Sequence, residues 1–154
     1  MTDLILVGGG LSNGLLAARL ATTRPNASFL VLEAGPSLGG NHTWSFHGSD
    51  VTPDAIEWLT SLGAVRFAGG HDVQLPGLRR TLDGTYYSLR SEDFAKNLRL
   101  VLGPRVRLDT RVAEAHATHV VLESGVVPEQ AFLAFHCNCG MKLPVVQSSL
   151  PPTR

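Results

Sequence analysis

The sequence predicts an α/β fold that begins with a βαβ unit, and three consecutive stretches carry this prediction. Asp3 to Val7 is a short apolar run that leads into three glycines, which is typical of a buried parallel strand followed by a tight turn. Ser12 to Thr23 has mostly apolar positions with helical character, and Pro25 ends it. Ser28 to Glu33 is a second β-rich run, so the passage has the size of a βαβ unit, roughly 30 residues.

Length and composition predict one globular domain. At 154 residues and 44% hydrophobic content, the chain is long enough to bury one core. Thirteen basic and thirteen acidic side chains balance, which argues against nucleic acid as a partner. No stretch reaches the roughly 18 apolar residues of a membrane span, and no basic segment opens the chain as in a secretory signal.

The number and spacing of the cysteines favour a reducing compartment. Cys137 and Cys139 are the two cysteines, and a disulfide between such close neighbours would be badly strained. We therefore expect a cytoplasmic protein, for which a peripheral contact with the inner membrane stays open.

The segment after Glu33 predicts a long loop, two helices and short strands. Residues 34–50, "AGPSLGGNHTWSFHGSD", are rich in glycine and are expected to form a loop of functional importance. Thr52 with Pro53 begins a helix that Gly63 ends, and Ser91 begins another that ends at Gly103. Short strands are expected at Val65–Phe67, Val73–Leu75 and Tyr86–Leu89, followed by a meander of small strands from Val106 to Val127.

The character of the sequence changes after Val127. "PEQAFLAFHCNCGMKLPVVQSSLPPTR" contains both cysteines and three prolines in its last eleven residues, and it does not continue the preceding pattern. We interpret residues 128–154 as an aberrant or disordered tail, and residues 1–127 as the N-terminal part of a nucleotide-binding domain.

The three glycines predict a Rossmann-like dinucleotide cradle. Gly8 and Gly10 fill the first two places of the G-x-G-x-x-G/A fingerprint, whereas the third place falls on Asn13, with Gly14 directly after it. Because the motif follows a predicted strand and opens a predicted helix, backbone N–H groups and the helix dipole would face a pyrophosphate. The competing interpretation is a glycine-rich turn with no ligand.

Glu33 strengthens the nucleotide interpretation. It stands at the end of the second strand, where a carboxylate accepts hydrogen bonds from a ribose diol, and this favours FAD or NAD over NADP. The position of the motif near the N-terminus and the second glycine pair, Gly39 and Gly40, favour FAD by analogy with known folds.

Two groups of potential metal ligands are better explained without a metal. His42 and His47 lie five residues apart in the glycine-flanked stretch, with Trp44 and Phe46 expected to anchor it to the core, and no third ligand follows at suitable spacing. A second group, His136 with the two cysteines, lacks a fourth ligand nearby, so we expect no metal site.

Five stretches, in this order, resemble the N-terminal part of bacterial lycopene beta-cyclases, which are flavoproteins of carotenoid synthesis. They are "LILVGGGLSNGLLAARL", "VLEAG", "GGNHTWSFH", "YYSLRSEDFAKNL" and "RVAEAHATHVVLESG". The glycine motif is shared with many flavoproteins, whereas "NHTWSFH" is far more specific. The resemblance covers Thr2 to Val127 and includes the departure at Asn13.

The resemblance implies a redox-neutral reaction on lycopene or a related carotenoid. The linear ends are protonated, each carbocation closes a six-membered ring, and loss of a proton gives beta-carotene. It also implies FAD in its reduced form, with NAD(P)H as the reductant. The family's cofactor-binding positions fall on residues of the glycine turn, at the second strand end and in the meander: Gly8, Gly9, Gly10, Leu11, Asn13, Gly14, Glu33 and Val112, the last through its backbone at the adenine.

The chain departs from the family pattern after the meander. Members of the family are more than twice as long, and their catalytic glutamate and substrate domain lie downstream, so no catalytic acid is assigned here. The sheet is expected to lack its closing strand, and a frameshift or truncation would produce such a junction. We expect an FAD-binding fragment that is inactive by itself; another flavin-dependent oxidoreductase and a non-catalytic dinucleotide-binding module are the alternatives.

Overall fold

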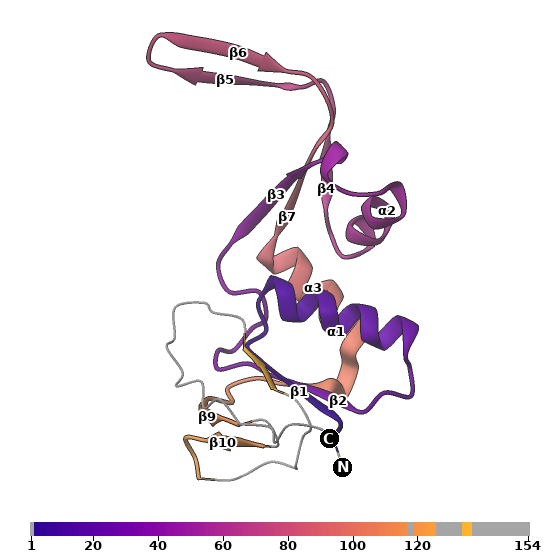
Figure 1. The fold of residues 1–154 in the computed structure, drawn as a ribbon, viewed down its shortest axis with the longest axis vertical. Helices are drawn as coiled ribbons and strands as arrows, with labels where there is room; N and C mark the ends of the chain where they lie inside the picture. Colours follow the sequence, from indigo (N-terminus) through magenta and orange to yellow (C-terminus); the bar gives the residue numbers. More distant parts are fainter. Residues whose placement is uncertain (1, 117–118, 126–133, 137–154) are drawn as a thin grey trace, which may run out of the picture. The chain divides into compact units, whose positions relative to one another are not determined.

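The computed structural model describes residues 2–116, 119–125 and 134–136, which gather into two compact units. The first unit is built from residues 1–40 and 99–154, and the second from residues 41–98 (Figure 1). Length predicts a single domain, but residues 41–98 pair among themselves in an antiparallel sheet and so form a unit inserted between the two halves of the first.

The first unit contains a four-stranded parallel sheet in the order β11–β1–β2–β8. The predicted βαβ unit is confirmed: β1 (Leu4–Val7) and β2 (Phe29–Leu32) pair directly, and α1 (Leu11–Thr23) connects them. This arrangement also confirms the predicted α/β class. The sheet is completed by β8 (Val106–Arg107) and β11 (Ala134–His136).

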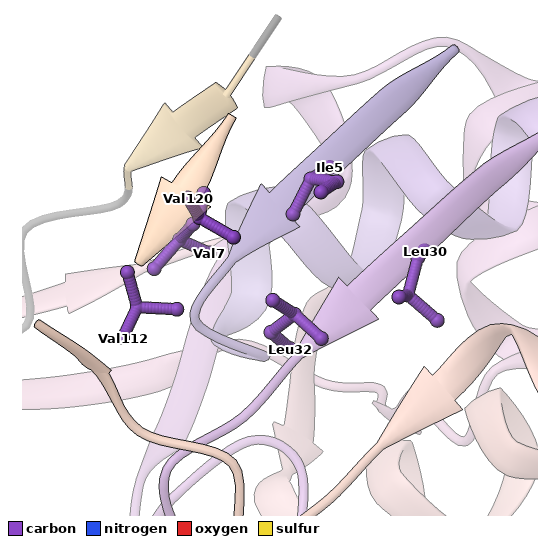
Figure 2. Packing of buried hydrophobic residues seen from close by; sticks show 6 residues of the cluster. All are labelled: Ile5, Val7, Leu30, Leu32, Val112 and Val120. Atoms are coloured by element: carbon purple, nitrogen blue, oxygen red, sulfur yellow. The ribbon is translucent and has the colours of Figure 1, made fainter. Parts of the chain in front are cut away.

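The core of the first unit lies on the sheet face that carries Ile5 and Val7 of β1 and Leu30 and Leu32 of β2. Val112 and Val120 pack against these four side chains from a two-stranded antiparallel sheet (Figure 2). That sheet consists of β9 (Val112–Ala115) and β10 (Val120–Leu122). Because side chains alternate along a strand, Leu6 and Val31 point to the other face, where they are also fully buried. The helix α1 buries Ala17 and Ala18.

Two expectations for the C-terminal half were wrong in part. The predicted meander contributes β8 to the parallel sheet, so only β9 and β10 form an antiparallel pair. The expectation that the sheet lacks a further strand also fails, because β11 runs parallel to β1, with Leu6 opposite Phe135. Ala134 to His136 pair with the edge of β1 that β2 leaves open. The rest of the predicted tail lies outside the described residues.

The second unit contains the antiparallel sheet β3–β7–β4. The long loop predicted for residues 34–50 was wrong in its second half, which forms β3 (Thr43–His47) and a 3-10 turn, η1 (Gly48–Asp50). The reason is tertiary, because β3 pairs with β7 (Tyr86–Arg90) far along the chain. Trp44 packs edge-on against Phe94, with ring centroids 5.6 Å apart, and Phe46 stacks on Tyr87 at 5.1 Å. The third strand is β4 (Val65–Phe67).

The helices follow their predicted boundaries closely. The helix α2 (Pro53–Ser61) is capped by Thr52, whose hydroxyl accepts from the Ala55 N–H at 3.4 Å. The helix α3 (Ser91–Leu102) precedes a 3-10 turn, η2 (Gly103–Arg105). Across the described part of the chain, no helix combines the length and apolar character that crossing a bilayer requires.

The hairpin of β5 (His71–Leu75) and β6 (Leu78–Leu82) extends away from the three-stranded sheet of the second unit (Figure 1). Only part of it was predicted, since β6 was missed. Its strands place polar side chains on one face, where the Asp72 carboxylate accepts from Arg79 at 2.8 Å and from Thr81 at 2.7 Å. Leu75 and Leu78 alternate with these residues and are more than half exposed.

Candidate functional site

The glycine turn between β1 and α1 has the geometry that a phosphate cradle needs. Gly8 has a φ of +89°, which favours glycine, and Gly10 caps α1 without any side chain. The first N–H groups of the helix, beginning at Leu11, have no acceptor within the helix. No acidic residue occupies the first turn of α1, so the positive end of the helix dipole is not offset by a carboxylate of that turn.

Gly9 lies where no side chain fits. A Cβ added at this position would collide with Cδ2 of Leu38 and would lie 3.2 Å from Oε2 of Glu33. Leu38 is itself fully buried, so its side chain has little room to yield. The Gly9 carbonyl accepts from the Gly39 N–H at 2.8 Å, which joins the glycine turn to the loop after β2.

Asn13 points back at the turn from the first turn of α1. Its side-chain Nδ2 donates to the carbonyl of Val7 at 2.8 Å and to the carbonyl of Gly8 at 2.8 Å. The residue is only 4% exposed; its bond to Val7 is buried and its bond to Gly8 is partly buried. The residue that departs from the fingerprint therefore contacts the protein's own backbone.

Glu33 follows β2 directly and joins three backbone segments. Its Oε2 accepts from the Gly9 N–H at 2.6 Å, and its Oε1 accepts from the Gly35 N–H at 2.7 Å. Its own N–H donates to the Arg107 carbonyl at 2.9 Å, and its carbonyl accepts from the Thr110 N–H at 2.8 Å. A carboxylate has about four acceptor positions, so capacity remains for further donors.

The structure brings seven of the eight predicted site residues to the carboxyl ends of β1 and β2. In parallel α/β sheets, ligands bind outside these strand ends. The seven are the turn residues, the first helical residues and the strand-end carboxylate: Gly8, Gly9, Gly10, Leu11, Asn13, Gly14 and Glu33. The eighth, Val112, begins β9 and is buried against Val7 and Leu32 in the core cluster (Figure 2).

Three residues that shape this site were not singled out from the sequence. Leu38 fills the space beside Gly9, and its only sequence signal is an apolar residue within a glycine-rich stretch. Asp109 and Thr110 bond to the Gly35 carbonyl and the Glu33 carbonyl at 3.0 Å and 2.8 Å. Asp109 has a φ of +50°, a left-handed conformation that no feature of the sequence announces.

The histidines of the second unit form ring contacts. His47 stacks on His71 with centroids 5.2 Å apart, and both rings contact Tyr86. His42 is exposed beside Trp44. Among residues 2–116, 119–125 and 134–136, no three His, Cys, Asp or Glu side chains are grouped as a metal site requires. Cys137 and Cys139 lie outside these ranges.

The fold is shared with flavoenzymes of known structure. The p-nitrophenol 4-monooxygenase PnpA from Pseudomonas putida DLL-E4 superposes with a TM-score of 0.65 at 16% identity, covering 87% of this chain and 40% of that one. The rebeccamycin biosynthetic enzyme RebC with reduced flavin gives a TM-score of 0.53 at 18% identity, covering 86% of this chain and 31% of that one. Both likenesses support the predicted Rossmann-like fold.

Sequence comparison identifies closer relatives. The lycopene beta-cyclase of Pseudescherichia vulneris is 49% identical over 125 residues, which are 81% of this chain and 32% of that protein. The lycopene beta-cyclase of Pantoea ananas is 43% identical over 125 residues, with the same coverage. The chain thus spans about a third of the length of the curated relatives that it matches.

A family model matches a longer stretch of the chain than these relatives do. The model described as "Lycopene cyclase protein" matches residues 3–140. This match extends beyond Val127, the expected end of the resemblance, and it includes β11. Because the matched residues make up most of the chain, the chain belongs to the lycopene cyclase protein family.

Proposed function

We propose that this chain is the N-terminal, FAD-binding part of a lycopene beta-cyclase. The observation that carries the proposal is the glycine turn at the N-terminus of α1, tied directly to Glu33, in a chain of the lycopene cyclase family. A pyrophosphate would lie at the helix N-terminus, and the ribose hydroxyls would donate to the Glu33 carboxylate.

The residues present fit FAD. The three glycines of the turn carry no side chain that could separate its backbone from a close-lying ligand. The side chain at the second strand end is a carboxylate, which suits a ribose diol and repels a 2′-phosphate. We assign the backbone of Val112 to the adenine. When bound in its reduced form, which NAD(P)H would maintain, the flavin supplies charge stabilisation for a cationic hydrocarbon.

For the whole protein we propose the cyclisation of lycopene or a related carotenoid, an acid-catalysed isomerisation that consumes no redox equivalents. It needs a carboxylic acid of raised pKa in an apolar cavity. Within the described residues, Glu57 and Glu92 are exposed, and the Asp93 carboxylate is paired with Arg90. None of these is a suitable acid, so we expect no cyclisation by this chain.

We also propose how the chain is organised and where it works. Residues 1–127, extended by β11, would form the nucleotide-binding part, and the residues after 140, where the family match ends, would form a divergent tail. Sequencing the coding region beyond Val127 in all three frames tests this division. A long continuation resembling a cyclase in another frame supports the tail as a frameshift product. For the whole protein we propose the cytoplasm, at the periphery of the inner membrane, because its proposed substrate is apolar.

FAD titration tests the proposal with the purified 154-residue chain. We expect flavin fluorescence to be quenched at a stoichiometry of one, with ADP competing and 2′-phosphorylated nucleotides competing poorly. Glu33→Gln should weaken binding, whereas Glu57→Gln, an exposed carboxylate in α2, should not. Absence of both FAD and ADP binding at millimolar concentration refutes the proposal. Substrate-dependent oxidation of NADPH would instead indicate a flavin oxidoreductase.

A further inference from the structure

We propose that Asn13 is a positioning residue that turns the backbone carbonyls of the glycine turn away from the bound anion. The inference rests on the proposed nucleotide site and assigns a physical role to the residue that replaces the third glycine of the fingerprint. Its side chain acts through the backbone and makes no contact with the nucleotide. As a result, the carbonyls of the turn are kept away from a pyrophosphate, which would meet the N–H groups at the start of α1.

Two consecutive peptide planes are each held at both ends. In the Val7–Gly8 peptide, the carbonyl accepts from Asn13 Nδ2 and the N–H donates to the Leu32 carbonyl, both at 2.8 Å. In the Gly8–Gly9 peptide, the carbonyl accepts from Asn13 Nδ2 at 2.8 Å and the N–H donates to Glu33 Oε2 at 2.6 Å. Since a trans peptide is planar, with its C=O and N–H pointing in opposite directions, these four bonds fix the orientation of both planes.

The remaining carbonyls of the turn are also occupied. The Gly9 carbonyl accepts from the Gly39 N–H, and the Gly10 carbonyl accepts from the Gly14 N–H, both at 2.8 Å. All four carbonyls from Val7 to Gly10 therefore bond to groups of the protein. A carbonyl dipole turned toward a pyrophosphate would repel it, so the arrangement removes the repulsive orientation at the positive end of the helix dipole.

Asparagine is the side chain that meets this requirement. Its amide carries two N–H donors, one for each carbonyl, and the two carbonyl acceptors identify the nitrogen as the atom that faces them. Aspartate has the same shape, but its oxygens would face two carbonyl oxygens and add a negative charge beside the anion. Glycine matches the fingerprint but leaves both carbonyls without this donor.

The test measures the preference for a diphosphate with the purified chain. The probes are ADP and adenosine, and the readout is the adenosine dissociation constant divided by the ADP dissociation constant, both from calorimetry, so that a higher ratio means a stronger preference for the diphosphate. Asn13→Gly should bind ADP about tenfold more weakly, the loss expected from one to two hydrogen bonds, and should bind adenosine nearly as well as the wild type. Asn13→Asp should lower the ratio further at pH 8 and recover part of it at pH 5, relative to the wild type at each pH, because a protonated carboxyl regains one donor.

Thr22→Gly is the control, since it places glycine at an exposed position in the last turn of the same helix, away from the N–H groups at its start. It should lower the melting temperature and leave the ratio unchanged. A ratio in Asn13→Gly equal to or above that of the wild type overturns the proposal. If Asn13→Asp does not fold, the uncharged Asn13→Gly still decides.

Amide hydrogen exchange separates this proposal from the proposed function. Removal of the Asn13 amide should speed exchange at the Gly9 and Gly39 N–H groups at least about tenfold relative to Ala17. If the wild-type chain binds neither ADP nor FAD, the proposed function fails. The amide exchange rates at Gly9 and Gly39 then decide whether Asn13 holds the turn. Unchanged exchange at Gly9 and Gly39 in Asn13→Gly overturns the positioning role.

Discussion

Glu33 and Gly9 lie 24 residues apart in the sequence and are joined by a hydrogen bond of 2.6 Å between the Gly9 N–H and the Glu33 carboxylate. The same carboxylate holds the Gly35 N–H with its second oxygen. One side chain thus connects the loops that follow β1 and β2, and the site depends on this link before any ligand arrives.

Replacing Glu33 by Gln should weaken this connection. The amide keeps one acceptor oxygen but presents an NH2 group to one of the two backbone N–H donors, which loses its partner. We expect a loss of about 1–2 kcal/mol of stability, together with weaker FAD binding. Thermal unfolding and FAD titration measure the two effects. Glu57→Gln is the control, and equal behaviour of the two variants would contradict the role given to Glu33.

Gly9→Ala should disturb the packing beside the turn. The added methyl group meets the buried Leu38 side chain, and relief requires that Leu38 or the turn move. Overpacking of this kind costs about 1–3 kcal/mol. Gly48→Ala is the matched control, because its Cβ would find its nearest neighbour at 3.4 Å. Denaturant unfolding of both variants compares the costs, and a stable Gly9→Ala protein that binds FAD normally would disprove the constraint.

Asp109 should tolerate glycine or asparagine better than alanine. Its φ of +50° is left-handed, and alanine lacks the short polar side chain that eases this conformation. Asp109→Ala should therefore lose about 1 kcal/mol of stability relative to Asp109→Asn. Melting temperatures provide the measurement, with Asp83→Ala, an exposed aspartate without a positive φ, for comparison. A loss of the same size at Asp83 would remove the backbone explanation.

The Arg90–Asp93 pair predicts a specific response to acid. The hydrogen bond from Arg90, at 2.8 Å, and its charge lower the pKa of Asp93 below its ordinary value of 3.8. A lowered pKa in the folded protein means that the stabilisation is present above the ordinary pKa and is lost as the pH falls through the folded pKa. Arg90→Gln should return the pKa of Asp93 toward 3.8 and remove its share of the acid dependence.

An NMR titration of the Asp93 carboxyl carbon measures this shift. Because both side chains are exposed, about 1 M salt should weaken the pair in the wild-type chain. Arg66→Gln removes an exposed arginine in β4 and should leave the Asp93 titration unchanged. Coincident titration curves for wild type and Arg90→Gln would show that the pair has no influence.

Local pattern was sufficient for part of the fold. β1, α1 and β2 were predicted because each has its own signal: an apolar run, a helix between glycine and proline, and a second apolar run. β3 was missed because its glycine-rich surroundings suggest a loop, and only pairing with β7 makes it a strand. β6, with Arg79 and Arg80 in its centre, lacks strand-like alternation and is defined by its register with β5.

The candidate site also contains some residues that local sequence pattern predicts and others that it does not. The glycines, Asn13 and Glu33 were predicted from a known spacing and from the resemblance, and the structure brings them together at the strand ends. Leu38 and the Asp109–Thr110 turn were not predicted, because they reach the site through contacts between segments distant in sequence. The role of Val112 at the adenine stays a prediction.

The bonds made by Asn13 suggest a different way to search genomes for such turns. A pattern that requires glycine at the third place passes over this chain, although its turn is held at every carbonyl. A query that accepts asparagine four residues after the central glycine, and asks for glutamate 24 residues after it, describes a hydrogen-bonded unit instead of a run of small residues. It would collect flavoprotein candidates by how the turn is held together and separate them from turns closed by glycine alone.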